Sequence, residues 1–304
     1  MSSDDNHTIG RHPNLAKRER MGAMATRNDP SALRWLVGVE LAHFRRQTSM
    51  TIAEASDASG ITRAKVGHME TGRYQQYPDD VARLLGSYGV AQRDIDRLTS
   101  LAGSTEGKSW WAPWSNVVPD WVKTFVGLEG LADAEFVFEP MVLPGLLQTE
   151  DYAQALTESA GFVRRDHSER FVSFRLARAK RLTEDDPLEL HAVIGEAALR
   201  FNIGTKEIRQ AQYRHLLKLA KLPNVTIQVL SPEDGQHVAT TGQFVVFDFA
   251  QAQSIAYSEH LEGAVYVQDQ DHLRTYKMAV ENLRSVASAP TKSVTLIRSM
   301  IDGS

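Results

Sequence analysis

The chain contains no cysteine at all. This absence excludes a disulfide framework, a metal site built on thiolates and a cysteine nucleophile, and it agrees with a reducing compartment. Long hydrophobic runs are also missing, because no segment approaches the length of a membrane span. The opening stretch MSSDDNHTIGRHPNLAKRER lacks the apolar core of a signal peptide. We therefore expect a cytoplasmic protein that does not enter the membrane.

Motifs for catalysis and cofactor binding are scarce as well. The chain has no HExxH sequence, no glycine loop that would cradle phosphate and no G-x-S-x-G serine elbow. Its 10 histidines lack the spacing of metal ligands. Glu196, Glu259 and His260 are acid–base candidates only in the sense that any Glu or His is one. We expect no enzyme activity, no cofactor and no metal.

The chain is long enough for two domains, since it has 304 residues, of which 42% are hydrophobic and 24% are charged. The net charge of -4 is unevenly distributed. Residues 11–103 carry 14 Lys or Arg and 10 Asp or Glu, whereas residues 104–304 carry 20 and 26. A mildly basic N-terminal part joined to an acidic C-terminal part allows DNA contact by the first and contact with another partner by the second.

Composition and periodicity divide the chain into four segments. Residues 1–30 have no sustained periodicity and are interpreted as a disordered basic arm. Its cations either belong to a solvated tail or lie on a phosphate backbone: Arg11, Lys17, Arg18, Arg20 and Arg27. Residues 31–103 predict an all-helical unit, residues 104–109 a linker, and residues 110–304 a larger α+β domain.

The helical unit is marked by local signals. Apolar residues at spacings of four, four and three predict a first helix from Ser31 with one buried face: Leu33, Val37, Leu41 and Phe44. Thr51 and Thr62 stand at N-cap positions of two short helices on either side of a turn at Gly60. Pro78 opens a fourth helix, and AQRDIDRLTSLAG forms a fifth.

A short helix, a glycine turn and a second short helix follow one another in the order of a helix-turn-helix, whose second helix enters the major groove of DNA. On a helical wheel drawn from the buried Val66 and Met69, outward positions fall on Ala64, Gly67 and His68, flanked by Arg63 and Lys65. We predict base contacts by four residues: Arg63, Ala64, Lys65 and His68. We predict contacts to the DNA backbone by three others: Thr51, Thr62 and Arg73.

The stretch from Val37 to Arg73, VGVELAHFRRQTSMTIAEASDASGITRAKVGHMETGR, resembles the helix-turn-helix of the lambda-repressor and Cro type, the XRE family. The shared features are the apolar triplet of the first helix, the Gly60-Ile61-Thr62 turn and the METGR ending. The resemblance implies DNA binding with base readers at the same four positions. One departure is Ile52, which stands where these proteins usually have a glutamine that braces the recognition helix and a phosphate.

The rest of the chain resembles the long C-terminal domain of actinobacterial XRE regulators of the WhiJ type. The segments that carry this likeness are WWAPW, EPMVLPGLLQTEDYAQAL, IGEAALR, GQFVVFDF and IAYSEH. Such regulators are often encoded beside a small partner protein, in the manner of antitoxin and toxin pairs. The resemblance therefore implies an antitoxin-like role as an alternative, with a small acidic protein encoded nearby as the partner.

The second domain alternates between strand-like and helical patterns. The strand-like segments are 133–142, 188–195, 224–231, 243–249 and 254–260, and the helical ones are 149–161, 164–182, 206–222 and a final helix at 270–287. The IGEAALR segment is interpreted as a turn. This mixed order, without strict alternation, predicts an α+β fold.

Three features of this domain are candidates for ligand or partner contact. Trp110, Trp111 and Trp114 either wall a pocket or pack a linker onto the domain. Gln148 follows a Pro-Gly turn and is either a binding residue or part of a helix start. Arg175 and Arg178 belong to an arginine-rich helix that docks an acidic partner, binds a second stretch of DNA or forms a solvated face.

These patterns together predict a transcription regulator. Its helix-turn-helix reads double-stranded DNA, and its C-terminal domain receives a ligand or protein partner. A homodimer on an inverted repeat is expected, because one short recognition helix contacts only a few base pairs. The alternatives are the antitoxin-like interaction protein and a small-molecule sensor.

Overall fold

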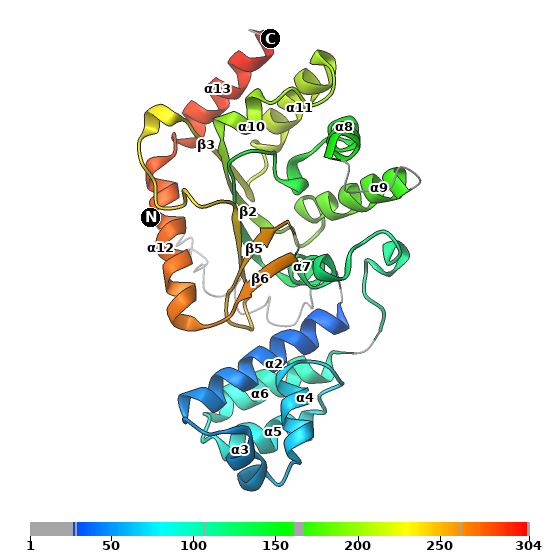
Figure 1. Cartoon of the computed structure of the whole chain (residues 1–304), viewed down its shortest axis with the longest axis vertical. Coiled ribbons are helices and arrows are strands. Elements are labelled where there is room, and N and C mark those ends of the chain that lie inside the picture. Colours follow the sequence, from blue (N-terminus) through cyan, green and yellow to red (C-terminus); the bar gives the residue numbers. More distant parts are fainter. Residues whose placement is uncertain (1–26, 28, 106, 161–166, 262, 303–304) are drawn as a thin grey trace, which may run out of the picture.

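The computed structural model of the chain describes residues 27, 29–105, 107–160, 167–261 and 263–302. Most of the predicted arm lies outside these residues, including Arg11, Lys17, Arg18 and Arg20. Figure 1 shows a helical unit at one end of the molecule and a larger part built around a β-sheet at the other. Within the described ranges, no helix combines the length and the apolar character that crossing a membrane requires.

The N-terminal unit consists of five helices, as predicted. They are α2 (Pro30–Gln47), α3 (Ile52–Ser59), α4 (Arg63–Glu70), α5 (Pro78–Ser87) and α6 (Gln92–Gly103). Their apolar faces meet in one core that includes Val37, Leu41, Ala55, Ile61, Val66, Met69, Leu84, Leu85 and Leu98. The predicted caps are also present, because the side chains of Thr51 and Thr62 accept hydrogen bonds from the first turns of α3 and α4.

The larger part contains a six-stranded mixed sheet in the order β3-β2-β1-β4-β5-β6. The strands are β1 (Ala134–Glu139), β2 (Glu189–Gly195), β3 (Val225–Leu230), β4 (Phe244–Asp248), β5 (Ile255–His260) and β6 (Gly263–Val267). Strands β1, β2 and β3 are parallel, and β4, β5 and β6 continue the sheet in antiparallel pairs. The predicted fold class, a helical domain followed by an α+β domain, is confirmed.

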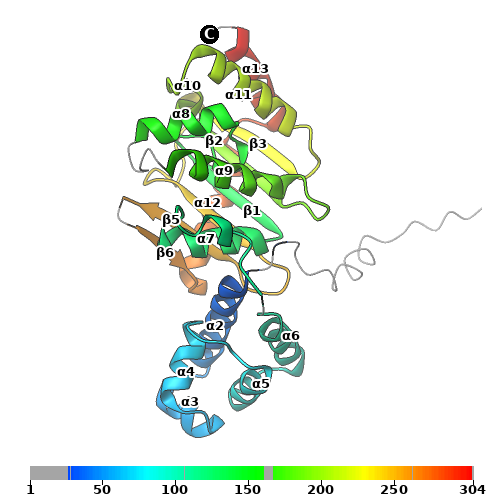
Figure 2. The ribbon, with the colours of Figure 1, turned by 90° about the vertical axis from the view of Figure 1, so that its right-hand side faces the viewer.

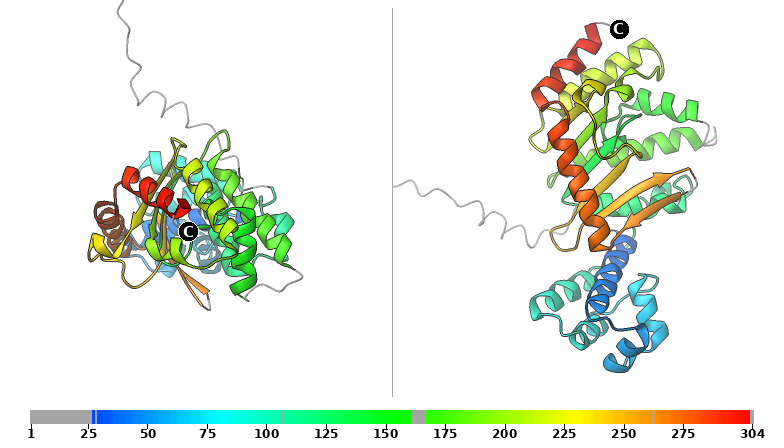
Figure 3. Two further views of the ribbon diagram at one scale, coloured as in Figure 1. Left: turned by 90° about the horizontal axis from the view of Figure 1, so that it is seen from above. Right: turned by 60° about the vertical axis from the view of Figure 1, so that its left-hand side comes forward.

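Helices cover both faces of this sheet. Figure 2 shows α7 (Asp120–Leu131), α8 (Glu150–Ala160), α9 (Ser168–Ala179) and α11 (Lys206–Leu219) against one face, with α13 (Pro290–Asp302) beside α11. Figure 3 shows α12 (Gln270–Val286) running along the other face. Successive side chains of β1 point to opposite faces of the sheet and so enter different cores. Val137 packs in the core beneath α9, whereas Phe136 and Phe138 pack in the core beneath α12. The short segments are α10 (Glu196–Arg200), η2 (Ala112–Trp114), η3 (Gly145–Leu147), η5 (Lys180–Leu182) and η6 (Pro232–Asp234).

Several elements differ from their prediction. The IGEAALR segment contains the helix α10, and the helix at 270–287 is followed by α13, so it is not the final one. Strand β6 and helix α7 were not predicted at all. Helix α7 is buried along most of its second half, so its apolar residues surround the helix and give no 3.6-residue period. Two of its glycines allow close packing, because a Cβ at Gly127 would lie 2.7 Å from the Ala32 Cβ.

Helix α2 belongs to both parts of the molecule. Val37 and Leu41 lie in the core of the helical unit, whereas Ala32, Leu36 and Val39 lie in the core of the sheet domain. The sequence predicted only one apolar face for this helix, the one that contains Val37 and Leu41. The opposite face, which faces the sheet domain, is buried by α7, so the two parts share one rigid element.

The predicted linker at 104–109 is tied down at both ends. Thr105 is buried and its hydroxyl donates to the Ala102 carbonyl at 2.9 Å. Ser109 donates at 2.9 Å to the carboxylate of Asp29, which also caps α2 and accepts from the Trp111 indole. The segment therefore fastens the helical unit to the sheet domain.

Residues 1–30 were predicted to form a disordered arm with exposed cations, but the structure shows Arg27 packed against the sheet domain. Its guanidinium pairs with Glu184 at 2.7 Å, donates to the Ala177 carbonyl at 2.6 Å and lies 4.3 Å from the Trp110 ring centroid. These contacts leave the residue buried. Arg27 is thus held by the sheet domain and not available to a phosphate backbone.

A second bridge connects the two parts near the middle of α2. The buried carboxylate of Glu40 pairs with Arg97 of α6 at 3.1 Å and accepts from the backbone nitrogen of Gln253 at 2.7 Å. Arg97 also donates to the Gln251 carbonyl. The loop between β4 and β5 is therefore bonded directly to the helical unit.

Candidate nucleic-acid interface

The C-terminal end of α4 is locked onto α2. The two backbones approach so closely at Gly38 that a Cβ there would lie 2.6 Å from the Glu70 carbonyl oxygen. Gln76 is fully buried and donates to the carbonyls of Met69 at 2.6 Å and Arg34 at 2.9 Å. The close backbone approach at Gly38 and the Gln76 side chain, which bonds to carbonyls of both helices, fix the orientation of α4 relative to α2.

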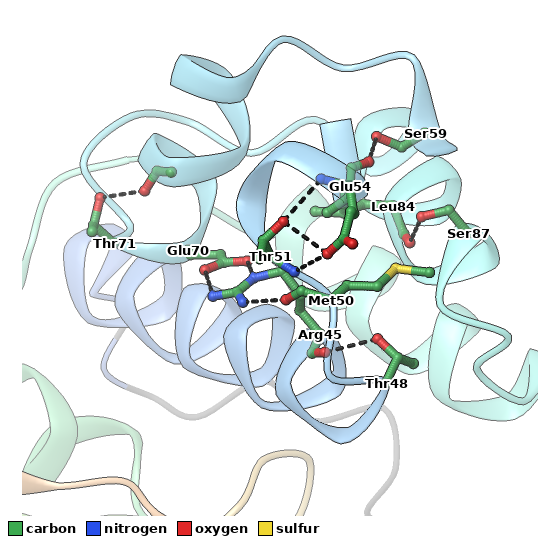
Figure 4. A network of polar contacts seen from close by, with 12 residues as sticks. Arg45, Thr48, Met50, Thr51, Glu54, Ser59, Glu70, Thr71, Leu84 and Ser87 are labelled. Atoms are coloured by element: carbon green, nitrogen blue, oxygen red, sulfur yellow. Dashed lines mark hydrogen bonds and ion pairs between the residues drawn. The ribbon is translucent and has the colours of Figure 1, made fainter. Parts of the chain in front are cut away.

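An ion pair completes this attachment, as Figure 4 shows. The Arg45 Nε and Nη2 donate to the two carboxylate oxygens of Glu70 at 2.6 and 2.8 Å, and Nη1 donates to the Met50 carbonyl at 2.7 Å. The hydrogen bond with Glu70 raises the pKa of Arg45 above its ordinary value, although burial opposes this. One guanidinium therefore joins α2, the start of α3 and the end of α4.

The N-termini of α3 and α4 are both exposed and capped. Thr51 and Glu54 form a reciprocal capping box, in which the Thr51 hydroxyl donates to the Glu54 carboxylate at 2.8 Å. This carboxylate has a pKa below its usual value because the Thr51 backbone N–H and hydroxyl donate to it. The Thr62 hydroxyl oxygen accepts from the Lys65 N–H at 3.4 Å, and its hydrogen has no acceptor among the described residues. Thr51 and Thr62 were both predicted to contact the DNA backbone. Among the described residues, only the Thr62 hydroxyl keeps a hydrogen that it could donate to a phosphate oxygen.

Two of the predicted base readers lie open on the first turn of α4. Arg63 and Ala64 are exposed, and Arg63 has no ion-pair partner within the described part of the chain. His68, one turn later, is half-buried because its ring packs edge-on against Tyr74, with the ring centroids 4.7 Å apart. The structure therefore brings Arg63 and Ala64 together at the helix start and orients His68 through a neighbour.

Lys65 is not free in the unbound protein. Its Nζ lies 2.5 Å from the carboxylate of Asp80, which also pairs with Arg83 at 2.5 Å. Burial raises the pKa of Asp80, but the hydrogen bonds from Lys65 and Arg83 outweigh it and leave this pKa below the usual value. The base contact by Lys65 stays a prediction, and it requires this ion pair to open.

Two tyrosines beside α4 were not among the residues predicted from the sequence. Tyr74 is 57% exposed and Tyr77 is 60% exposed, which is unusual for such large rings. The guanidinium of Arg73, also exposed, lies 5.9 Å from the Tyr74 ring centroid. Ile52, at the start of α3, is 37% exposed. The available signal was the polar stretch YQQY directly after the METGR ending.

The tryptophans of the second domain have packing roles. Trp110 stacks on Phe174 with the centroids 6.0 Å apart, and Trp114 lies 6.1 Å from the same ring. Trp111 donates to Asp29 at the start of α2. This arrangement agrees with the alternative in which the tryptophans pack a connecting segment onto the domain.

Neither named arginine of the 164–182 helix is a freely solvated cation, and their contact with a ligand or partner stays a prediction. Arg178 points inward and forms a bidentate ion pair with the buried Glu129, with distances of 3.0 and 2.5 Å. Arg175 donates at 2.9 Å to Gln148, a buried residue that donates in turn to the Leu143 carbonyl. Burial lowers the pKa of Arg175 to about 10. Both guanidinium groups are thus held by partners from the same domain. Arg164 and Arg165 lie outside the described residues.

Comparison with known families agrees with this division. A helix-turn-helix domain model matches residues 36–98, which confirms the predicted DNA-binding domain. A family described as a domain of unknown function, DUF5753, matches residues 122–299. No curated protein and no solved structure matches the chain. Because the second match spans more than half of its length, the chain belongs to the DUF5753 family and carries a helix-turn-helix domain in front of the domain that defines it.

Proposed function

We propose that this protein is a sequence-specific regulator of transcription whose helix α4 enters the major groove of its operator. The observation that carries the proposal is the exposed first turn of α4 on a rigidly held helix-turn-helix. Arg63 lies there without a carboxylate partner within the described ranges, so its guanidinium is available to the O6 and N7 atoms of a guanine. Ala64 beside it suits a thymine methyl group.

The neighbouring polar groups suit the DNA backbone. Thr62 has a free hydroxyl hydrogen, and the exposed Arg73 carries a charge that follows the helix. Phosphate contacts of this kind set the position of the protein on DNA, while base contacts supply the specificity. Tyr74 is added to the predicted set, because it orients His68 and is itself exposed.

We infer that the protein binds as a homodimer to an inverted repeat. A helix of eight residues reaches only a few base pairs, and specificity over a genome requires two half-sites about one helical turn apart. In this proposal the protein is a regulator and not an enzyme, and the DUF5753 domain receives the signal. The resemblance to actinobacterial regulators of the WhiJ type supports this division of labour.

The proposal is tested by selecting a binding site from random DNA and measuring affinity for it. Arg63→Ala should weaken specific binding by roughly 1 to 3 kcal/mol and relax the preference at one position of each half-site. The matched control is Arg93→Ala, which removes an equally exposed cation from α6 of the same unit. Equal losses in both variants, with the site preference unchanged, would show that α4 does not read bases.

The antitoxin-like alternative stays a prediction. It places a small acidic partner on the C-terminal domain, where two of the predicted contact residues, Arg175 and Arg178, bond to Gln148 and Glu129 of the same domain. Purification from native cells distinguishes the two roles. A stoichiometric small protein would favour the antitoxin role, and a homodimer recovered alone would favour the regulator.

A further inference from the structure

A cavity of about 280 Å³ lies where the three parallel strands begin. The register sets the first residues of β1 and β2 side by side, and β3 begins next to them. Arg284 of α12 also lines the cavity, which therefore lies on the face of the sheet that α12 covers. The rest of the lining includes Phe136, Glu189, His191, Asn224, Thr226 and Asp248. This volume is close to the lower limit for ligand pockets, so the cavity suits a small molecule.

Gln228 determines how His191 presents its ring. The Gln228 Nε2 donates at 3.1 to 3.3 Å to three backbone carbonyls, those of Arg284, Ala287 and Ser288, so its Oε1 can only accept. The His191 Nε2 lies 2.7 Å from that Oε1 and therefore carries the proton. Burial lowers the pKa of His191, which favours the neutral ring. The His191 Nδ1 is thus an acceptor, and no described residue bonds to it.

Asn224 supplies a second acceptor of fixed orientation. Its Nδ2 donates to the carbonyls of Leu182 at 3.1 Å and Leu188 at 2.8 Å, so both amide hydrogens are used and Oδ1 is left to accept. Thr226, on the neighbouring strand β3, has a hydroxyl that forms no hydrogen bond within the described part of the chain. The cavity therefore offers two acceptors and one hydroxyl for which the described chain supplies no partner.

The charged groups at the cavity are mostly balanced already. Asp248 pairs with Lys277 at 3.8 Å, and the Nη1 of Arg284 pairs with Glu281 at 3.0 Å. The Nε and Nη2 of Arg284 have no acceptor in the described ranges, so they remain donors. Glu189, which is exposed, is the one lining carboxylate without a described cation. A ligand therefore needs no net charge, but it needs several groups that both donate and accept.

We propose that this cavity binds a small uncharged polyol of the size of a monosaccharide. Each hydroxyl of such a molecule can donate one hydrogen bond and accept others. Two hydroxyls donate to His191 Nδ1 and Asn224 Oδ1, and another accepts from Arg284. An anionic ligand would meet the unpaired Glu189, and an ammonium group would lie beside the Arg284 guanidinium. The proposal rests on the signal-receiving role given above to the DUF5753 domain.

The cavity wall at Asp248 continues into the loop that contacts the helical unit. Asp248 is the last residue of β4, and its carboxylate accepts from the Ser254 hydroxyl at the end of that loop. Within the loop, the Gln253 backbone nitrogen donates to Glu40 of α2 at 2.7 Å. A ligand hydroxyl that bonds to Asp248 competes with Ser254. Binding therefore acts on the loop and, through Glu40, on the helix that holds α4.

The site is tested with simple probes and the full-length chain. Glucose, ribose and myo-inositol are the neutral polyols, glucuronate and glucosamine add a charge of either sign, and cyclohexanol keeps a ring with a single hydroxyl. Saturation-transfer NMR at millimolar concentrations measures their binding. We expect at least one neutral polyol to bind, more tightly than either charged sugar, and no signal from cyclohexanol.

One pair of variants assigns the binding to the cavity. Arg284→Met keeps the apolar stem and removes the donors, so it should lower the polyol affinity about tenfold. Arg274→Met is the matched control, because Arg274 lies on the same helix and pairs with Asp271 three residues away at 3.0 Å, as Arg284 does with Glu281.

A second variant fills the cavity. Thr226→Phe adds a ring at a position whose hydroxyl bonds to no described residue, and it should abolish polyol binding. Thr291→Phe, at an exposed threonine of α13, is its control and should bind as the wild type does. Circular dichroism melting confirms that each variant is folded before its affinity is compared.

The coupling to DNA is measured on the same wild-type sample. Saturating polyol should change the operator affinity about fivefold or more. A polyol that binds but leaves the operator affinity unchanged would refute the signalling role of the cavity.

Three results would overturn the site itself: no binding of any neutral polyol, tighter binding of a charged sugar or cyclohexanol, or equal affinities in the Arg284→Met and Arg274→Met variants. A protein that binds its operator but no polyol refutes the site and leaves the proposed regulator intact. A protein that binds a polyol but no DNA refutes the regulator and leaves the site intact.

Discussion

At the scale of single residues, the interface with DNA depends on which cations have a partner inside the protein. Arg63 and Lys65 are two residues apart on one exposed helix turn, yet only Lys65 is neutralised. The difference comes from Asp80, a carboxylate that is 6% exposed and lies at the start of α5. Asp80 thus determines how much positive charge α4 presents to a phosphate backbone.

We predict that Asp80→Asn will strengthen non-specific DNA binding. The substitution releases Lys65 and Arg83, and the plot of log affinity against log salt should steepen by about one unit for each of them that then contacts a phosphate. Asp79→Asn is the control, since it removes a neighbouring exposed carboxylate that holds no cation among the described residues. A fluorescence-anisotropy titration on random duplex DNA at several salt concentrations measures both slopes. Identical slopes for the two variants would mean that Lys65 does not contact DNA.

At the scale of elements, the packing of α2 against α4 and the burial of β1 have measurable consequences. The close approach at Gly38 fixes the orientation of the recognition helix. Strand β1 places Glu135 and Glu139 on the same covered face, where burial raises the pKa of both carboxyls. Each element therefore carries one position at which a small substitution tests the packing.

Gly38→Ala should destabilise the helical unit by about 2 kcal/mol and weaken operator binding. The added methyl lies 2.6 Å from a backbone oxygen that cannot move independently, so α4 must shift away from α2. Gly86→Ala on α5 has nothing within 4 Å of the new methyl and should stabilise the protein by about 0.5 to 1 kcal/mol. Urea unfolding of both variants checks the signs. A stable Gly38→Ala protein with full operator affinity would contradict the described approach of the two helices.

The pH dependence of stability should reflect Glu139. Its pKa is about 8 in the folded chain against an ordinary value of 4.5, so between these pH values the folded state holds a proton that the unfolded state has released. Stability therefore falls as the pH rises through this window, by at most about 1.4 kcal/mol per pH unit from this residue. Glu135 contributes with the same sign. In the Glu139→Gln variant, the free energy of unfolding should fall less steeply with pH. Urea unfolding at pH 5, 6, 7 and 8 measures this dependence. The same pH dependence in variant and wild type would mean that Glu139 ionises normally.

At the scale of the whole molecule, α2 makes the two parts one cooperative unit. Its residues lie in both cores, and buried Asp29 and Glu40 connect it to the tryptophan segment and to the β4–β5 loop. The orientation of the helix-turn-helix is therefore set by the sheet domain. A change in the DUF5753 domain has a direct mechanical path to α4.

We expect the wild type to melt in a single calorimetric transition, because unfolding either core exposes one face of α2. Replacing both bridges, in the double variant Asp29→Ala/Glu40→Ala, removes the α2 cap and the bonds to Ser109 and Gln253. The transition should then separate into two, with the helical unit melting first since its core is the smaller one. The double variant Asp271→Ala/Glu281→Ala on the exposed side of α12 is the control and should melt as the wild type does. Two transitions in the wild type would contradict the shared helix.

The N-terminal domain could be predicted almost completely because its signals are local. Thr51, Gly60, Thr62 and Pro78 act through capping, positive φ and helix initiation, which involve residues only a few positions apart. Most strands of the second domain were recognised for a similar reason, because alternating burial leaves a period of two in the sequence. Helix α7 escaped, since a helix buried on nearly all sides has no polar face to mark its period.

The sequence by itself therefore determined the helix-turn-helix, its recognition helix and the α+β class of the second domain. Only the tertiary structure decided that Lys65 is paired and Arg63 is not, that Arg175 and Arg178 point inward, and that α2 serves two cores. The physical reason is the range of the interactions. Caps, turns and periodicity depend on near neighbours, whereas ion pairs and buried faces depend on side chains that meet only after the chain has folded.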